Sequence, residues 1–178
     1  GLVKGASKGE GLGNKFLANI RETDAIIHVL RCFDNDNITH VDGSVDPVRD
    51  KEIIDIELQL KDLESLNNRM EKVNRTAKSG DKDAVREKEV LQKAIDFIES
   101  SNNIRSINLD MPDINKYLKP LQLITSKPVL YVCNVDENSI NSTNNHVESV
   151  KSLINKEGAN LIVLAAGIES EINELDNY

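Results

Sequence analysis

The sequence predicts an α/β fold, in which a parallel sheet is interrupted by an antiparallel α-helical hairpin. Short apolar runs at residues 25–30, 127–133 and 160–166 are typical of buried strands. A helical pattern at residues 146–157 stands between the last two runs, and strand, crossover helix and strand form the βαβ unit of a parallel sheet. Between the first two runs lie two long helical stripes, which predict the hairpin.

The chain begins with a glycine-rich segment. Residues 1–13 contain five glycines, which permit positive φ angles and close backbone approach but resist packing. Such a segment is either a flexible linker or a loop that wraps a ligand. Phe16, Leu17 and Ile20 follow at helical spacing, and Asp24 leads into the first strand. Because loop, helix and strand are continuous, we expect a ligand-binding loop that is poorly packed when its ligand is absent.

The hairpin is predicted from residues 47 to 100. Asp46 is placed to cap the first helix, and Pro47 suits its first turn because the missing N–H costs nothing there. Gly80 is a natural left-handed end for that helix. The two apolar stripes are Ile56, Leu60, Leu63, Leu66, Met70, Val73 and Ala77, followed by Ala84, Lys88, Leu91, Ile95 and Ile98. At about 1.5 Å per residue the first helix would project beyond a small domain.

Polar residues follow two of the predicted strands. Asn134-Val135-Asp136-Glu137 ends the second strand, and Ala165-Ala166-Gly167 ends the third. Carboxyl ends of neighbouring parallel strands meet at one edge, where open α/β sheets bind ligands. GTPases place Asn-Lys-x-Asp here, and the Asp accepts hydrogen bonds that only guanine offers. Glu137 is one methylene longer, which argues against guanine. Taken alone, the four residues also suit an ordinary polar turn.

Several of these segments closely resemble the YchF/Obg-like ATPase family, which are P-loop proteins of the translation-factor class. The resemblance is carried by residues 1–26, by Val29–Phe33 and by Asn134–Glu137, and it extends to about Asp176. It implies a partial P-loop, G-domain-like parallel sheet, with residues 1–46 and 101–178 as the nucleotide-binding part. Residues 47–100 would be the coiled-coil hairpin that interrupts this domain in the family.

The resemblance also implies a nucleotide site. Gly1 would be the glycine of the Asp-x-x-Gly switch that senses the γ-phosphate. The Asn-x-x-Glu variant goes with a preference for ATP over GTP, and the whole protein would be an ATPase that uses Mg²⁺. The fifth nucleotide motif is normally Ala-Ala-x-Glu, and the extra Gly167 leaves its register open by one residue. The implied nucleotide-binding residues are Gly1, Asn134, Val135, Glu137, Ala165, Ala166 and Gly167.

One expected motif does not occur. A P-loop needs Gly-x-x-x-x-Gly-Lys-[Ser/Thr] to hold the phosphates and the metal ion, and the sequence has neither Gly-Lys-Ser nor Gly-Lys-Thr. We therefore interpret the chain as the middle of a longer protein. The magnesium ligand and first switch would precede Gly1, a small β-domain would follow Tyr178, and we expect no metal site within the chain itself.

His40 is the predicted catalytic residue. GTPases usually place a Gln directly after the switch glycine to orient the attacking water. Leu2 stands there and cannot bind water, so another group must do so, and His40 lies in a polar loop. His28 lies in a strand pattern and is better explained by packing. His146, at a helix start, is expected at the surface.

Composition bears on nucleic-acid binding, on the state of the cysteines and on membrane association. The sequence has 22 basic and 30 acidic residues, a net charge of −8, which argues against a general basic surface for nucleic acid. Cys32 and Cys133 lie in strand patterns, as buried reduced thiols do. No apolar run approaches the roughly 20 residues that span a bilayer, so we expect a cytoplasmic protein with no membrane partner.

Two alternatives remain open at this stage. The nucleotide site could be vestigial, with the protein acting as a ribosome-binding or RNA-binding adaptor through its hairpin, whose turn is rich in Lys and Arg. The hairpin could instead self-associate as a coiled coil. Charged side chains on a helix usually do no more than face solvent, and this is the simplest explanation of the Lys and Arg residues near the turn.

Overall fold

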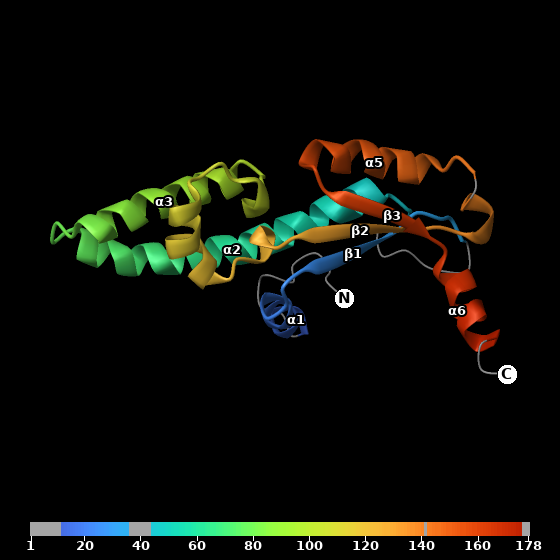
Figure 1. Ribbon diagram of the computed structural model, residues 1–178, viewed down its shortest axis with the longest axis horizontal. Helices are drawn as coiled ribbons and strands as arrows, with labels where there is room; N and C mark the ends of the chain where they lie inside the picture. Colours follow the sequence, from blue (N-terminus) through green and yellow to red (C-terminus); the bar gives the residue numbers. More distant parts are fainter. Residues whose placement is uncertain (1–11, 36–43, 141, 176–178) are drawn as a thin grey trace. The chain divides into compact units, whose positions relative to one another are not determined.

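The computed structural model describes residues 12–35, 44–140 and 142–175 (Figure 1). These residues form two compact units. The hairpin unit comprises Gly1–Asp24 and Ile53–Pro128, and the sheet unit comprises Ala25–Glu52 and Val129–Tyr178. The predictions for Gly1, the glycine-rich segment up to residue 11 and His40 fall outside the described residues.

The sheet unit contains three parallel strands. These are β1 (Ile26–Arg31), β2 (Val129–Asn134) and β3 (Asn160–Leu164), hydrogen-bonded in the order β1-β2-β3. Helix α5 (Asn145–Glu157) connects β2 to β3, and α6 (Ala166–Leu175) follows β3. Strand, crossover helix and strand therefore form the expected βαβ unit, and the predicted α/β fold class is confirmed.

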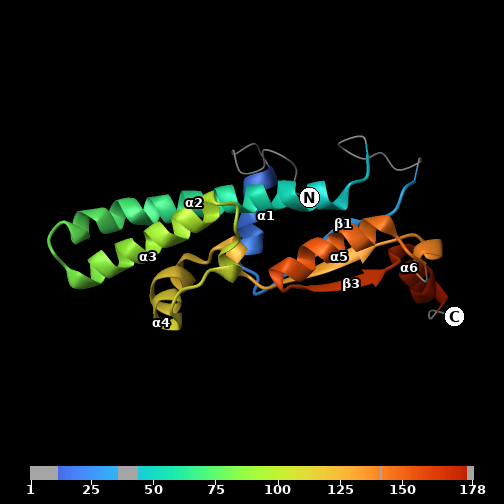
Figure 2. The same ribbon diagram turned by 90° about the horizontal axis from the view of Figure 1, so that it is seen from above.

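Helix α5 covers one face of this sheet (Figures 1 and 2). Its apolar residues Val147, Val150 and Ile154 are buried against the strands. Cys32 and Cys133 lie in the same core, fully buried and free, as expected. Interaction with the Cys133 thiol, together with burial, raises the pKa of the Cys32 thiol.

The opposite face of the sheet is apolar; its residues on β1 and β3 are exposed, whereas Val132 on β2 is buried. Val29 on β1 pairs with Val132 on β2, which in turn pairs with Ile162 on β3. Val29 and Ile27 are 60% and 67% exposed, and Ile162 is 44% exposed.

The hairpin unit is built on two antiparallel helices. Helix α2 (Pro47–Ala77) begins in the sheet unit and continues into the hairpin unit, where α3 (Lys82–Glu99) returns beside it (Figure 2). The Arg49 N–H donates to Asp46 Oδ1 over 3.0 Å, so the predicted cap is present. Gly80 has φ +84° in the turn, the left-handed conformation expected of it.

The two helices pack along part of their predicted stripes, because Ile56 and Leu60 are exposed at 51% and 42% and Lys88 is also exposed. Leu66, Met70 and Val73 of α2 and Leu91 and Ile95 of α3 are buried in one core. An Arg–carboxylate pair also links the helices: the Arg69 guanidinium donates to both oxygens of Glu87, over 2.6 and 3.0 Å. The assignment of residues 47–100 as a separate domain stays a prediction.

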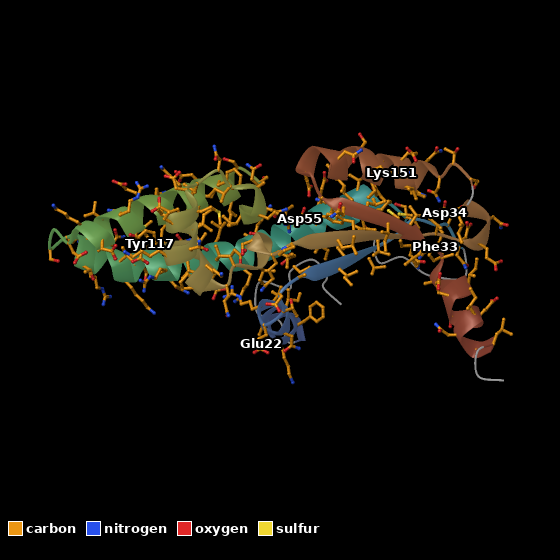
Figure 3. The ribbon with its side chains drawn as sticks, viewed as in Figure 1. Glu22, Phe33, Asp34, Asp55, Tyr117 and Lys151 are labelled. Carbon is orange, nitrogen blue, oxygen red and sulfur yellow. The ribbon has the colours of Figure 1, made fainter. Side chains whose placement is uncertain are left out.

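Short helical turns complete the hairpin unit, together with α1 (Leu12–Arg21). Tyr117 lies against the hairpin and donates to Asp83 Oδ1 of α3 over 2.8 Å (Figure 3). The turns after α3 are η2 (Ile104–Ser106), α4 (Met111–Asp113), η3 (Ile114–Leu118), η4 (Lys119–Leu121) and η5 (Ile124–Ser126).

Helix α2 carries three charged side chains that are almost fully buried, those of Lys51, Glu57 and Asp62. Asp62 accepts hydrogen bonds from the N–H groups of Ile124 and Thr125 and from the Thr125 hydroxyl, at 2.7–2.8 Å. Lys51 donates to Glu157 at the end of α5 over 2.5 Å, and its ammonium lies 5.3 Å from the Tyr131 ring centre. Asp62 therefore fixes α2 to η5 in the hairpin unit, and Lys51 fixes its first turns to α5 in the sheet unit.

Two features are absent from the part of the chain that the structure describes. None of the helices in residues 12–35, 44–140 and 142–175 is long and apolar enough to cross a membrane. Within the same ranges no three His, Cys, Asp or Glu side chains gather in a way that could hold a metal ion.

Candidate nucleotide-binding edge of the sheet

Asn134 joins the ends of all three strands. As the last residue of β2, it pairs with Arg31 of β1 and with Leu164 of β3. Its carbonyl accepts the Cys32 N–H over 2.8 Å, and its side-chain Oδ1 accepts the Ala166 N–H over 3.0 Å. The amide that the sequence singled out thus lies beside the Ala165-Ala166-Gly167 segment, as neighbouring strand ends predict.

Val135 is buried and is hydrogen-bonded to β3 through its backbone. Its side chain is buried in the sheet core, and its N–H donates to the Leu164 carbonyl over 2.9 Å. The Val135 N–H is therefore already engaged by β3. A base contact made by the Val135 backbone would fall to its carbonyl, which is a hydrogen-bond acceptor.

Asp136 and Glu137 have different positions despite their similar chemistry. Asp136 caps the short turn η6 (Glu137–Ser139) by accepting the Ser139 N–H over 2.9 Å. Glu137 is the first residue of that turn and is exposed. Both residues are exposed, and Asp136 is the one whose carboxylate closes the turn.

The end of β3 passes directly into helix α6. Ala165 is buried, and its carbonyl accepts the Glu169 N–H over 3.2 Å in the first helical turn. Ala166 and Gly167 are exposed at the start of α6. A Cβ added to Gly167 would meet no atom within 4 Å, so open space lies beside this turn. Small residues here leave the backbone accessible to a flat ligand.

A second set of polar residues lies at the end of β1, and none of them was among the predicted site residues. The Asn144 side chain donates to the Cys32 carbonyl over 2.8 Å and accepts the Val147 N–H over 3.2 Å, so it both caps α5 and holds the end of β1. An Asn directly before a helical pattern is a recognisable N-cap signal. His146 Nε2 lies 3.4 Å from Asp34 Oδ2.

Phe33 and Asp34 follow β1 at this end of the sheet unit (Figure 3). The Arg31 guanidinium stacks over the Phe33 ring, 4.9 Å from its centre, and donates to the Phe33 carbonyl over 3.1 Å. His28, further back on β1, is half-buried, and its ring lies 5.5 Å from that of Tyr131. This contact agrees with the packing role expected for His28.

The comparisons with known proteins give the chain's relatives. No protein-family profile matches it. The ribosome-binding ATPase YchF of Haemophilus ducreyi is 49% identical over 177 residues, and that of Bacillus subtilis is 50% identical over 178 residues. Each alignment covers 99% of this chain and 48% of the relative. The chain is a homologue of YchF.

A solved structure supports the same relationship. The YchF GTPase of Schizosaccharomyces pombe matches with a TM-score of 0.82 at 32% sequence identity, over 97% of this chain and 48% of that one. The resemblance to the YchF family is therefore confirmed in sequence and in fold. The chain spans about half the length of the relatives it matches.

Proposed function

We propose that this chain supplies the base-recognising edge of the nucleotide site in a YchF-type nucleoside triphosphate hydrolase. The bond from the Ala166 N–H to Asn134 Oδ1 carries the proposal, because it brings the two predicted base-binding segments together. The bacterial relatives are named ribosome-binding ATPases, which supports ATP hydrolysis, the ribosome as partner and a cytoplasmic location.

ATP is the proposed substrate, in preference to GTP. Guanine recognition needs a carboxylate that accepts from the ring N–H and the 2-amino group together, and Glu137 at this position is longer than Asp. Mg²⁺ would accompany the phosphates, held by residues outside this chain. His40 stays the predicted residue for positioning the attacking water, and Gly1 the predicted γ-phosphate sensor.

Competition between ATP and GTP for the full-length protein tests this proposal. We expect ATP to bind more tightly, and Glu137→Asp to shift the preference towards GTP. Asn134→Ala should weaken both nucleotides, because it releases the β3–α6 turn as well as any base contact. A clear preference of the unaltered protein for GTP would refute the proposal.

The structure favours Glu137→Asp as a single change. Adding Val135→Lys would imitate the GTPase motif more closely, but Val135 is only 3% exposed and packs in the sheet core. A lysine there would have to leave the core or bring its charge into it, and either change would destabilise the protein. Loss of binding in the double variant would then not report on the base.

An adaptor function through the hairpin is the second candidate. The turn between α2 and α3 exposes the basic side chains Lys72, Arg75, Lys78 and Lys82. Exposed acids, including Glu71 and Asp81, stand among them, so the surface is mixed. Replacing the four basic residues with Gln and measuring sedimentation with ribosomes separates this role from nucleotide hydrolysis, which the change should leave intact.

A further inference from the structure

A series of hydrogen bonds connects the start of α5 to the predicted base-binding residues. The Asn144 side chain donates to the Cys32 carbonyl over 2.8 Å, and the Cys32 N–H donates to the Asn134 carbonyl, also over 2.8 Å. Asn134 Oδ1 in turn accepts the Ala166 N–H over 3.0 Å. All four residues belong to the sheet unit. The bonds therefore run within one unit, from the cap of α5 across the ends of β1 and β2 to the start of α6.

Cys32 is the middle of this series and is held from both sides. Its N–H bonds to Asn134 and its carbonyl to Asn144, and the residue is fully buried. Without the Asn144 amide, the carbonyl would lose this donor in a buried position, where an acceptor without a partner is costly. We expect the end of β1 to move toward solvent in that case, and the Asn134 peptide to move with it.

Asn144 uses both ends of its amide. The nitrogen donates to Cys32, while Oδ1 accepts the Val147 N–H over 3.2 Å and caps α5. A helix cap needs only an acceptor, which Ser, Thr or Asp supplies equally well. An amide adds two donors to that acceptor. The donor is therefore the part of Asn144 that serves the end of β1 and not the helix.

A second link joins the same two elements and is weaker. His146 Nε2 lies 3.4 Å from Asp34 Oδ2, and the Asp34 side chain is 82% exposed. An exposed pair at this distance contributes little. The bond from Asn144 to the buried Cys32 is the stronger of the two links between α5 and β1.

We propose that Asn144 is a positioning residue for base recognition, which keeps Asn134 in place by holding the Cys32 peptide. The inference rests on the proposed nucleotide function and adds a residue to it. Asn144 acts through Cys32 and makes no contact with the nucleotide itself. Its loss should weaken the contacts to the base and leave those to the phosphates, because the predicted phosphate-binding motifs lie elsewhere in the protein.

Nucleotide binding to the full-length protein tests this role. Asn144→Ala should weaken ATP and adenosine alike, by about fivefold to tenfold, the scale of one hydrogen bond. The KM for ATP should rise with little change in kcat, because the lost contact is made equally in the ground state and the transition state. Tripolyphosphate has no base and should inhibit both proteins equally. A loss of tripolyphosphate affinity as large as the loss of ATP affinity would overturn the proposal.

Asn144→Ser separates positioning from helix capping. The Ser hydroxyl can accept the Val147 N–H, so the cap is kept. A single oxygen cannot also stand where the amide nitrogen reaches Cys32. We expect this variant to be more stable than Asn144→Ala and to bind ATP just as weakly. Recovery of ATP affinity in Asn144→Ser would show that only the cap matters, and would overturn the proposal.

Two control variants match these changes. Asp81→Ala removes the cap of α3 in the hairpin unit, where Asp81 accepts the Ala84 N–H over 2.8 Å. It should lower stability without changing the affinity for ATP. His146→Ala removes the exposed link to Asp34 and should change the affinity less than about twofold. A loss of affinity in Asp81→Ala equal to that in Asn144→Ala would mean that binding follows overall stability, contrary to the proposal.

The outcomes also separate this inference from the proposed function. If the unaltered full-length protein does not bind ATP, the proposed function is wrong and the inference fails with it. If the unaltered protein binds ATP and both Asn144 variants bind it equally well, the inference alone is wrong.

Discussion

Asp62 and Lys51, two of the buried charged residues on α2, show two different ways of keeping an ion away from water. Asp62, in the hairpin unit, is 0% exposed, and three neutral donors satisfy it, with Arg21 further away at 3.8 Å. Lys51, in the sheet unit, is 2% exposed and forms an ion pair with the carboxylate of Glu157. Lys51 and Asp62 are eleven positions apart on one helix.

The two arrangements differ in whether the group left behind can reach water after its partner is replaced. The donors to Asp62 are the N–H groups of Ile124 and Thr125 and the Thr125 hydroxyl. Both residues are buried, so water does not reach these donors when the carboxylate is removed. Glu157 keeps 27% of its side chain exposed, so it can be solvated if Lys51 is lost. Lys51 itself has no such access. The comparison therefore predicts unequal costs for four simple substitutions.

The largest effect is expected for Asp62→Ala. It leaves the N–H groups of Ile124 and Thr125 without their acceptor, and each buried unsatisfied donor costs about 1–3 kcal/mol. We expect the free energy of unfolding to fall by about 3–5 kcal/mol. Urea denaturation measures it. Glu64→Ala, an exposed change half a turn further along α2, is the matched control and should cost less than about 0.5 kcal/mol.

A loss below about 1 kcal/mol for Asp62→Ala would contradict this interpretation. It would mean that water enters the turn and replaces the carboxylate. Hydrogen exchange of the Ile124 and Thr125 amides would show this directly, because both should exchange slowly in the unaltered protein and quickly in the variant.

Replacing Glu157 should destabilise the protein more than replacing Lys51, although both changes break the same ion pair. Glu157→Ala takes an ion-pair partner away from a buried ammonium, and should cost about 3 kcal/mol. Lys51→Met leaves a carboxylate that reaches solvent and places an apolar chain in the core, and should cost about 1 kcal/mol or less. The same denaturation assay compares them. Equal costs would show that both groups are equally able to reach water.

The sequence was sufficient for the parts of the fold that depend on periodicity. The apolar runs located β1, β2 and β3, the two stripes located α2 and α3, and Gly80 marked the turn between the helices. The nearness of Asn134 to Ala166 followed from strand topology alone. These features are local, or they follow from rules of parallel sheets.

The sequence was not sufficient for contacts between segments far apart in the chain. Asp62 falls in a helix that is charged on most of its surface, and nothing local marks it as the acceptor for a turn 62 residues later. Lys51 and Glu157 are 106 residues apart and appear as ordinary surface charges. Asn144 and Cys32 are 112 residues apart, and the sequence marks Asn144 only as a helix cap. Tertiary packing selects these residues, and a single sequence carries no periodic signal for it.

The smallest expected effect compares Asp62 with an exposed aspartate, Asp83. Burial raises the pKa of Asp62, and the hydrogen bonds from Thr125 and Ile124 oppose that rise. The hydrogen bond from Lys116, and then that from Tyr117, lowers the pKa of Asp83. The two carboxylates therefore shift in opposite directions from the same unfolded value of 3.8.

Opposite shifts give opposite dependence of stability on pH. A raised pKa means that the folded state holds its proton more tightly, so the stability from Asp62 is complete below pH 3.8 and is lost as pH rises through its folded pKa. A lowered pKa means that the stability from Asp83 is present above pH 3.8 and is lost as pH falls through its folded pKa.

Asn variants isolate each group, because the other titrations cancel in the difference from the unaltered protein. On acidification from pH 7, the stability advantage of the unaltered protein over Asp62→Asn should grow. Its advantage over Asp83→Asn should shrink, and the change should be small because Asp83 is exposed and salt screens its link to Lys116. Urea denaturation at several pH values, repeated at high salt, measures both. Slopes of the same sign would mean that burial does not dominate at Asp62 and that its neutral donors hold the carboxylate ionised as firmly as Lys116 holds Asp83.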